Sequence, residues 1–392
     1  MKIRGYREGD RGALARLGVV AFGGNVADWE KYYTREENPS LDPEQIYVVE
    51  EDGEARASAA VLRLEVFVDG RAVPMGGVAA VKTHPAYRRR GYAGELMRAA
   101  LRGMRERRTR LSMLEPFAHA FYRVYGWELI MESIRYVLKP TDLPTSSEQR
   151  RVRVYVEGDS RQMMELLEEE AAGHPCCVRR VEKRWRRYLG REDREAAVYE
   201  GQGGVEGYLL YKMSGWEEGR TPRRTLEISE FVAATPEARA GLLSFAAAQD
   251  PLVFGIEHST PRGDPLHPYL RSSYVEARVS PEFMLRLVDV EGALELLSRK
   301  VDEPLVLEVA DDGIPENAGE YTVGDGGVVR GVQAQGRIAL DVRQLAQLYA
   351  GYLSARQLAR HGWIKPDSSR ALELLEAYFP AGDPWVFPPD HF

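Results

Sequence analysis

Cysteines and long apolar runs are both scarce in this sequence. Of 392 residues only two are cysteines, and Cys176 and Cys177 are adjacent. Neighbouring cysteines rarely form a disulfide, and no spaced set of cysteines and histidines indicates zinc, so we expect no metal and a structural or incidental role for both thiols. No window approaches the ~20 apolar residues that a membrane helix needs, which excludes a membrane-spanning protein.

A secretory signal and an excess of basic charge are also missing. The N-terminal residues MKIRGYREGD lead into no apolar stretch, so the sequence predicts a cytoplasmic protein. The 53 basic and 60 acidic side chains give a net charge of −7, which argues against nucleic-acid binding and fits a cationic substrate. A chain of this length exceeds the usual size of one hydrophobic core, so we expect two or three domains.

One strand–turn–helix unit has an unusual concentration of charge. Residues 46–83 read as apolar strands separated by Asp/Gly turns, which predicts an antiparallel meander. After Gly91, the apolar residues Leu96, Ala100, Leu101 and Met104 recur at helical spacing and predict an amphipathic helix. The loop between strand and helix holds three consecutive arginines, which repel one another unless an anion lies nearby.

The arginine run has a physical reason if the loop binds phosphate. A glycine turn that opens a helix presents unpaired backbone N–H groups at the positive end of the helix dipole. Gly91 lets the backbone approach a ligand closely, and Ala93 is small enough not to block it. The turn therefore predicts a phosphate-bearing ligand, with a solvated basic loop as the alternative.

The sequence VKTHPAYRRRGYA resembles motif A of the GNAT N-acetyltransferases, whose R/Q-x-x-G-x-G/A turn binds the pyrophosphate of acetyl-CoA. Arg88, Gly91 and Ala93 occupy the pattern positions. The resemblance implies acetyl-CoA as co-substrate. By that resemblance the cofactor-binding residues are Val81, Lys82 and Thr83 for the pantetheine arm, Arg88, Arg89, Arg90, Gly91, Tyr92, Ala93 and Gly94 for the phosphates, and Phe117 and Ala118 for a further contact.

The same strand–turn–helix order recurs in residues 230–249, with only Arg239 in place of the arginine run and Gly241 in place of Gly91. This repeat predicts a second, degenerate copy of the first domain, with chance similarity as the alternative.

From Phe283 onward the pattern of helices and strands changes to an α+β type. The last residues, WVFPPDHF, are aromatic and stiffened by two prolines, so we expect them to be docked.

This layout, together with the segment FYRVYGWE, resembles the enhanced intracellular survival (Eis) family of acetyltransferases. The resemblance implies a mixed α+β and α/β fold class: tandem GNAT folds, the second degenerate, and a C-terminal α+β domain like sterol carrier protein. The expected domains are 1–146, 147–284 and 285–392. It also implies a homohexamer and a primary amine acceptor, either a small molecule (an aminoglycoside or polyamine) or a peptide or lysine side chain.

The resemblance assigns Tyr122 as general acid and the C-terminal carboxylate of Phe392 as general base. A tyrosine hydroxyl, with a pKa of about 10, is protonated at neutral pH and can donate to a departing sulfur. A terminal carboxylate, with a pKa of about 3.5, is a weak base unless burial raises its pKa. Tyr125 is expected to pack. Asp28, Trp29, Glu37 and Asp390 are candidates for a negatively charged acceptor pocket.

Two alternatives to this function stay open at the level of sequence. One is an N-acyltransferase that uses a longer acyl-CoA donor, which would need an apolar channel. The other is a non-catalytic protein that binds CoA or a lipid, with the C-terminal domain supplying the cavity.

Overall fold

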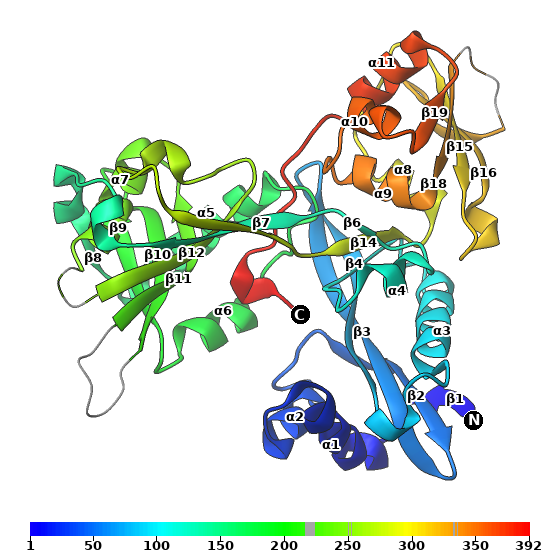
Figure 1. Ribbon diagram of the computed structural model, residues 1–392, viewed down its shortest axis with the longest axis horizontal. Coiled ribbons are helices and arrows are strands. Elements are labelled where there is room, and N and C mark those ends of the chain that lie inside the picture. Colours follow the sequence, from blue (N-terminus) through cyan, green and yellow to red (C-terminus); the bar gives the residue numbers. More distant parts are fainter. Residues whose placement is uncertain (216–223, 250, 252, 332–333, 335) are drawn as a thin grey trace.

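The computed structural model describes the whole chain except residues 216–223, 250, 252, 332–333 and 335. The described residues form three β-sheets of seven, seven and five strands. Each sheet is the centre of one lobe, and Figure 1 shows the three lobes arranged around the C-terminal segment, drawn in red. This layout confirms the mixed fold class that the sequence predicted.

The first lobe has a sheet of order β1-β2-β3-β4-β5-β14-β6. Strands β2, β3 and β4 form the predicted antiparallel meander, and β4 then runs parallel to β5. Helices α1 and α2 lie on the opposite side of the sheet from α3 (Figure 1). The elements are β1 (Lys2–Gly5), α1 (Arg11–Phe22), α2 (Val26–Tyr32), β2 (Leu41–Glu51), β3 (Glu54–Val68), β4 (Arg71–Thr83), α3 (Tyr92–Glu106), β5 (Leu111–Leu114), α4 (His119–Arg123), β6 (Glu128–Leu129) and β14 (Met284–Leu287).

The second lobe has a sheet of order β13-β7-β12-β11-β10-β9-β8. Its strand β11 runs parallel to β12, as β4 does to β5 in the first lobe. The elements are β7 (Glu132–Leu138), β8 (Val152–Val154), α5 (Ser160–Ala172), α6 (Glu182–Leu189), β9 (Glu195–Glu200), β10 (Val205–Ser214), β11 (Arg224–Ala233), α7 (Pro236–Ala247), β12 (Val253–Pro261) and β13 (Glu276–Pro281).

The two seven-stranded sheets exchange one strand each. Strand β7 leaves the first lobe and pairs between β12 and β13, while β14 returns after the second lobe and pairs between β5 and β6. Read from β8, the second sheet then has the same order as the first, with the exchanged strand in the same place. This match supports the predicted duplication. The domain ranges 1–146, 147–284 and 285–392 stay a prediction. Strands β7 and β14 link the first two lobes, because each pairs within the sheet of the other lobe.

The third lobe is a five-stranded sheet of order β17-β16-β15-β18-β19 with helices packed on it. Its elements are α8 (Val290–Glu295), β15 (Leu305–Ala310), β16 (Gly319–Gly324), β17 (Gly327–Arg330), β18 (Gly336–Asp341), α9 (Val342–Tyr349), α10 (Ala355–Arg360), β19 (Ile364–Pro366) and α11 (Ser369–Tyr378). After α11 the chain leaves this lobe and ends between α6 and the first sheet (Figure 1).

Helix α3 forms because its apolar face has a sheet to cover. Leu96, Ala100, Leu101 and Met104 are all buried in one cluster with residues of the sheet beneath them. Side chains alternate between the two faces of a strand. On β3, the residues that pack beneath α3 therefore alternate with residues that pack on the α1 and α2 side of the sheet. The amphipathic helix predicted from the sequence is therefore confirmed.

The corresponding turn in the second lobe is built differently. Thr235 caps α7 by accepting a hydrogen bond from the N–H of Ala238, and Gly241 lies inside the helix. The expected equivalence of Gly241 with Gly91 is therefore wrong, because Gly91 itself caps α3. Arg239 is paired with Asp264 at 2.7 Å. The second copy thus has no free arginine run at this position.

The C-terminal segment is docked, as its aromatic residues predicted. Trp385 and Phe387 are 3% and 5% exposed. Cys176 and Cys177 are both buried free thiols, and Cys177 packs in one apolar cluster with Trp385 and Phe387, in agreement with a structural role. None of the helices in the described part of the chain is long and apolar enough to cross a membrane.

Candidate active site

Strands β4 and β5 separate part-way along the first sheet. They are paired from Met75 and Leu111 to Gly77 and Met113, after which β4 continues to Thr83 while β5 ends. Beyond Gly77, the edge of β4 that faced β5 has no strand partner among the described residues. Backbone N–H and C=O groups need a partner, so this gap can bind an extended ligand through backbone hydrogen bonds.

A bulge lies in the same stretch of β4. The pairing with β3 shifts between Ser58–Lys82 and Ala60–Ala79, so that two residues of β4 face one residue of β3. One of the two, Ala80, has a φ of 50°, in the left-handed region that few residues other than glycine adopt. Bulges of this kind bend a strand and redirect its backbone groups, and they occur often beside functional sites.

The arginine turn follows directly after β4. Gly91 has a φ of 84°, and no heavy atom lies within 4 Å of the position that a Cβ would take there. Arg88 and Arg89 are exposed and have no carboxylate within 4.0 Å among the described residues, whereas Arg90 lies 3.4 Å from Glu51. Free N–H groups at the start of α3 and two unpaired cations thus meet at one place, which favours a phosphate.

Two of the predicted cofactor residues turn their side chains away from this path. Tyr92 is buried in the apolar cluster beneath α3. Lys82 is 2% exposed, donates a hydrogen bond to the hydroxyl of Tyr33 at 2.5 Å, and lies 4.4 Å from the centre of the Trp29 ring. Burial lowers the pKa of Lys82 to about 7. Both residues are available to a ligand through their backbone only.

The other predicted cofactor residues differ in their exposure. Val81, Thr83 and Ala93 are half-buried, and Phe117 and Ala118 are exposed at the start of α4. Gly94 packs against Tyr125, because a Cβ on this glycine would lie 2.5 Å from the tyrosine hydroxyl oxygen. Gly94 and Tyr125 thus bring the segment after α4 against α3, in agreement with the packing role expected for the tyrosine.

Tyr122 lies on α4 among other aromatic rings. The centres of the Phe117 and Trp127 rings are 5.3 and 6.5 Å from its own. Its side chain is 2% exposed and shares an apolar cluster with Val78 and Leu114, the residues that border the gap. Its hydroxyl has no hydrogen-bond partner among the described residues, and burial raises the pKa of Tyr122. The phenol is therefore protonated at neutral pH, with its O–H free to donate.

Phe392, the last residue, packs on the other face of the first sheet. Its ring lies 5.2 Å from that of Phe283, and two of its atoms are 2.7 and 3.0 Å from the position that a Cβ on Gly77 would take. Gly77 therefore leaves room for this ring at the last pair before the gap. Phe392 packs with the cluster on the α1 and α2 side, and Tyr122 with the cluster on the α3 side.

A buried arginine anchors the C-terminal segment to the second lobe. Arg180 donates to Asp390 through Nε, at 2.9 and 3.0 Å, and through Nη2, at 2.7 Å, and it also donates to Glu230 through Nη1 at 3.0 Å. Arg184 donates to the backbone carbonyl of His391 at 3.0 Å. Asp390 is fully buried, so its predicted place in the acceptor pocket is wrong: its carboxylate binds Arg180 instead.

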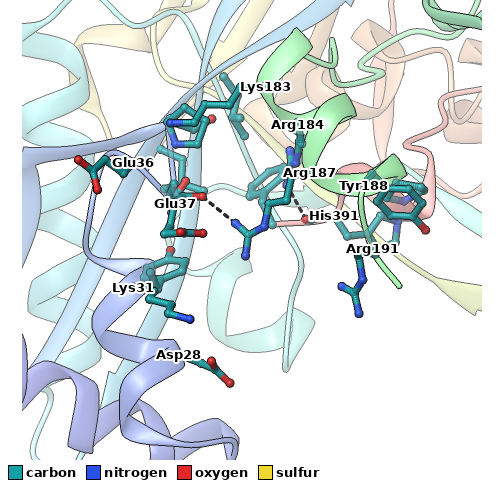
Figure 2. Close-up of a pocket in the computed structure, with 18 of the residues that line it drawn as sticks. Asp28, Lys31, Glu36, Glu37, Lys183, Arg184, Arg187, Tyr188, Arg191 and His391 are labelled. Carbon is teal, nitrogen blue, oxygen red and sulfur yellow. Dashed lines mark hydrogen bonds between the residues drawn. The ribbon is translucent and has the colours of Figure 1, made fainter. Parts of the chain in front are cut away.

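A cavity of about 810 Å³ opens between the first and second lobes and reaches the last residue of the chain. Figure 2 shows it between α2 with the following loop on one side and α6 on the other. The residues that line it are Asp28, Lys31, Tyr32, Glu36, Glu37, Asn38, Pro39, Ser40, Leu62, Leu64, Lys183, Arg184, Arg187, Tyr188, Arg191, Arg194, Ser229, Pro388, Pro389, His391 and Phe392.

The charge of this cavity differs from the expectation. Asp28 and Glu37 line it, whereas Trp29 lies over Lys82. Among the described residues that line the cavity, six side chains are basic and three are acidic. Helix α6 and the residues just after it supply most of the basic ones. The predicted negatively charged pocket is therefore wrong in sign, although two of its predicted acids, Asp28 and Glu37, do line the cavity.

Comparisons with known proteins agree with this fold. Residues 2–130 and 176–287 each match the model of an acetyltransferase (GNAT) domain, and residues 290–387 match that of a sterol carrier protein domain. The structure of Eis1 from Mycobacterium abscessus is similar with a TM-score of 0.80 at 22% identity, over 100% of both chains. The chain is a GNAT acetyltransferase with an Eis-like fold.

Other relatives of this GNAT acetyltransferase extend the same similarity. A GCN5-related N-acetyltransferase from Anabaena variabilis has a TM-score of 0.86 at 23% identity, over 100% of both chains. Among curated sequences, an uncharacterized N-acetyltransferase of Streptomyces avermitilis is 27% identical over 83% of this chain and 82% of its own length. One of Streptomyces griseus is 26% identical over 83% of each.

Three features of this candidate site could not be placed from the sequence. Nothing marks Ala80 as a bulge, and the contact between Arg180 and Asp390 joins residues 210 positions apart. The basic side of the cavity had a signal, because the segment 183–191 reads KRWRRYLGR. The position of this segment opposite α2 depends on how the two lobes pack, which cannot be predicted from the sequence.

Proposed function

We propose that this acetyltransferase transfers the acetyl group of acetyl-CoA directly to a primary amine, with Tyr122 as general acid and the C-terminal carboxylate of Phe392 as general base. The observation that carries the proposal is the packing of these two residues on opposite faces of the sheet, beside the gap between β4 and β5. A donor bound along the α3 side and an acceptor in the cavity on the other side meet in that gap.

The donor side is supported by the backbone and by charge. An extended pantetheine arm fits the free edge of β4, through the backbone of Val81, Lys82 and Thr83. The diphosphate fits the start of α3, where Arg88 and Arg89 are unpaired and Gly91 leaves open space. GNAT domains imply acetyl-CoA as the co-substrate, and both features suit it.

The chemical step follows from the two groups. The neutral amine nitrogen attacks the thioester carbonyl carbon, a C–N bond forms and the C–S bond breaks. The terminal carboxylate of Phe392 takes the proton from the nitrogen, and the hydroxyl of Tyr122 gives its proton to the sulfur. The products are the N-acetylated amine and free CoA. Because burial raises the pKa of Tyr122, its hydroxyl remains protonated until negative charge develops on the departing sulfur.

The test is thiol release from acetyl-CoA with a panel of amines, on the intact protein and two variants. Tyr122→Phe keeps the ring and removes the proton donor, and we expect turnover to fall by about 10²–10⁴-fold with little change in acetyl-CoA binding. Extension of the chain by one glycine after Phe392 moves the carboxylate by one residue and should have a similar effect. Full activity in the extended protein would exclude the terminal carboxylate as base.

Tyr125→Phe is the matched control for Tyr122→Phe. Tyr125 is a neighbouring buried tyrosine that packs on α3 at Gly94, so the loss of its hydroxyl should leave turnover within a few-fold of the intact protein. A panel of acyl-CoA lengths separates acetyl transfer from transfer of a longer acyl group. The homohexamer remains a prediction from the resemblance, and sedimentation of the intact protein tests it.

A further inference from the structure

Two basic side chains of α6 enter the acceptor cavity without a carboxylate partner. Lys183 donates to the backbone carbonyl of Arg35 at 3.4 Å, and Arg187 donates to that of Glu37 at 2.7 Å. No carboxylate lies within 4.0 Å of either among the described residues. A guanidinium has five N–H donors, so Arg187 keeps most of them after this one bond. Both side chains are exposed to the cavity, where they favour an anion.

The opposite side of the cavity has unpaired acids. Asp28, Glu36 and Glu37 are exposed and have no basic partner within 4.0 Å among the described residues. Figure 2 shows these three across the cavity from Arg184, Arg187 and Arg191. Lys31 of α2 also lines the cavity, so the side formed by α2 and its following loop is acidic on balance, with three carboxylates and one lysine, whereas the side formed by α6 is basic.

We propose that the preferred acceptor is an amine that also bears an anionic group, a carboxylate or a phosphate, which Lys183 and Arg187 bind. This inference rests on the proposed function, because it assigns the cavity to the acceptor of that reaction. The ammonium end is attracted by the acidic side and by the terminal carboxylate of Phe392, while the anionic group lies toward α6. One ligand then satisfies charges of both signs.

The same charges select against polycations. A polyamine or aminoglycoside would bring several positive charges to a cavity whose described residues supply six basic side chains against three acidic ones and the terminal carboxylate of Phe392. Like charges brought together without partners cost free energy, and such repulsion is a common source of specificity. A net negative charge on the whole chain does not offset this, because salt screens charges beyond about 8–10 Å.

The experiment compares acceptors that differ only in the anionic group. Nα-acetyl-lysine and N-acetylcadaverine each have one primary amine on the same chain, and only the first carries a carboxylate. Phosphoethanolamine and ethanolamine form the corresponding pair for phosphate, and spermidine is the polycation. The intact protein should show kcat/KM for the anionic member of at least one pair about tenfold or more above its neutral partner, the effect of one charged hydrogen bond.

Variants on α6 test the assignment to named residues. Lys183→Gln combined with Arg187→Gln should bring the ratio within a pair close to one, mainly by raising KM for the anionic amine. Arg186→Gln is the matched control: Arg186 lies on the same helix, pairs with Glu182 at 2.6 Å, and does not line the cavity. It should leave the ratio unchanged.

The outcomes separate this inference from the function beneath it. Equal kcat/KM within both pairs, a preference for spermidine, or a ratio that survives the double variant would overturn the inference while acetyl transfer stands. Absence of thiol release with every amine would overturn the proposed function, and the inference with it. A preference for the carboxylate pair or the phosphate pair identifies which anion the basic side binds.

Discussion

Arg180 binds Asp390 through three hydrogen bonds of 2.7 to 3.0 Å, and so fixes the C-terminal segment two residues before the chain ends. The same guanidinium also binds Glu230 of β11, in the second lobe. Phe392 packs on the first lobe, but its position therefore depends on Arg180 of the second lobe, which binds both Asp390 and Glu230. If the terminal carboxylate is the base, the second lobe is part of the catalytic geometry although its own turn has no free arginines.

Asp390→Asn and Glu230→Gln each remove one carboxylate from Arg180, but only the first loosens the C-terminal segment. We expect Asp390→Asn to lower kcat/KM for the amine by about tenfold or more, because a hydrogen bond between charged groups contributes about 1.5–3 kcal/mol. Acetyl-CoA binding should be unchanged. Glu230→Gln should alter thermal stability with a smaller effect on turnover. Equal losses of activity in the two variants would mean that Asp390 acts through stability alone.

The turn at Gly91 gives a second prediction. Gly91→Ala places a methyl group in the open space where a phosphate would approach, and we expect it to weaken acetyl-CoA binding by about tenfold or more. The backbone strain itself costs about 1–2 kcal/mol, because φ is 84°. Gly53→Ala is the matched control, since Gly53 also has open space and a φ of 77° but lies in a hairpin turn. Calorimetric titration with acetyl-CoA measures both.

Such turns could be predicted from the sequence because their signals are local. The apolar spacing from Leu96 to Met104 and the glycine before it define α3 without reference to distant residues. The exchange of β7 and β14 could not be predicted. Both segments have the sequence pattern of strands, but nothing in either pattern indicates the sheet in which it pairs. The place of Asp390 could not be predicted for the same reason: nothing near it in the sequence shows that its carboxylate pairs with Arg180 instead of lining the acceptor pocket.

Adjacent glycines on β4 give a third prediction. A Cβ on Gly77 would lie 2.7 Å from the Phe392 ring, whereas a Cβ on Gly76 would lie 2.6 Å from the sulfur of Met104 beneath α3. We expect Gly77→Ala to displace the terminal residue and lower turnover at saturating acetyl-CoA. Gly76→Ala should instead lower thermal stability, because the clash lies in the core. Turnover and melting temperature should be measured for both variants. Full turnover in the Gly77→Ala protein would contradict the proposal that catalysis depends on the position of Phe392.

The last prediction concerns Lys82, whose ammonium is buried between the rings of Trp29 and Tyr33. An unfolded lysine keeps its proton up to a pH of about 10.4, whereas burial lowers the pKa of Lys82 in the folded protein to about 7. Between these values unfolding takes up a proton, so this residue makes the free energy of unfolding rise with pH, by at most about 1.4 kcal/mol per pH unit. Lys82→Met should remove this rise and stabilise the protein most at pH 7 and below. Lys365→Met, which removes an exposed ammonium, should retain it, and urea unfolding at pH 7, 8 and 9 measures both slopes. An unchanged slope in Lys82→Met would show that the two rings hold the charged form through this range.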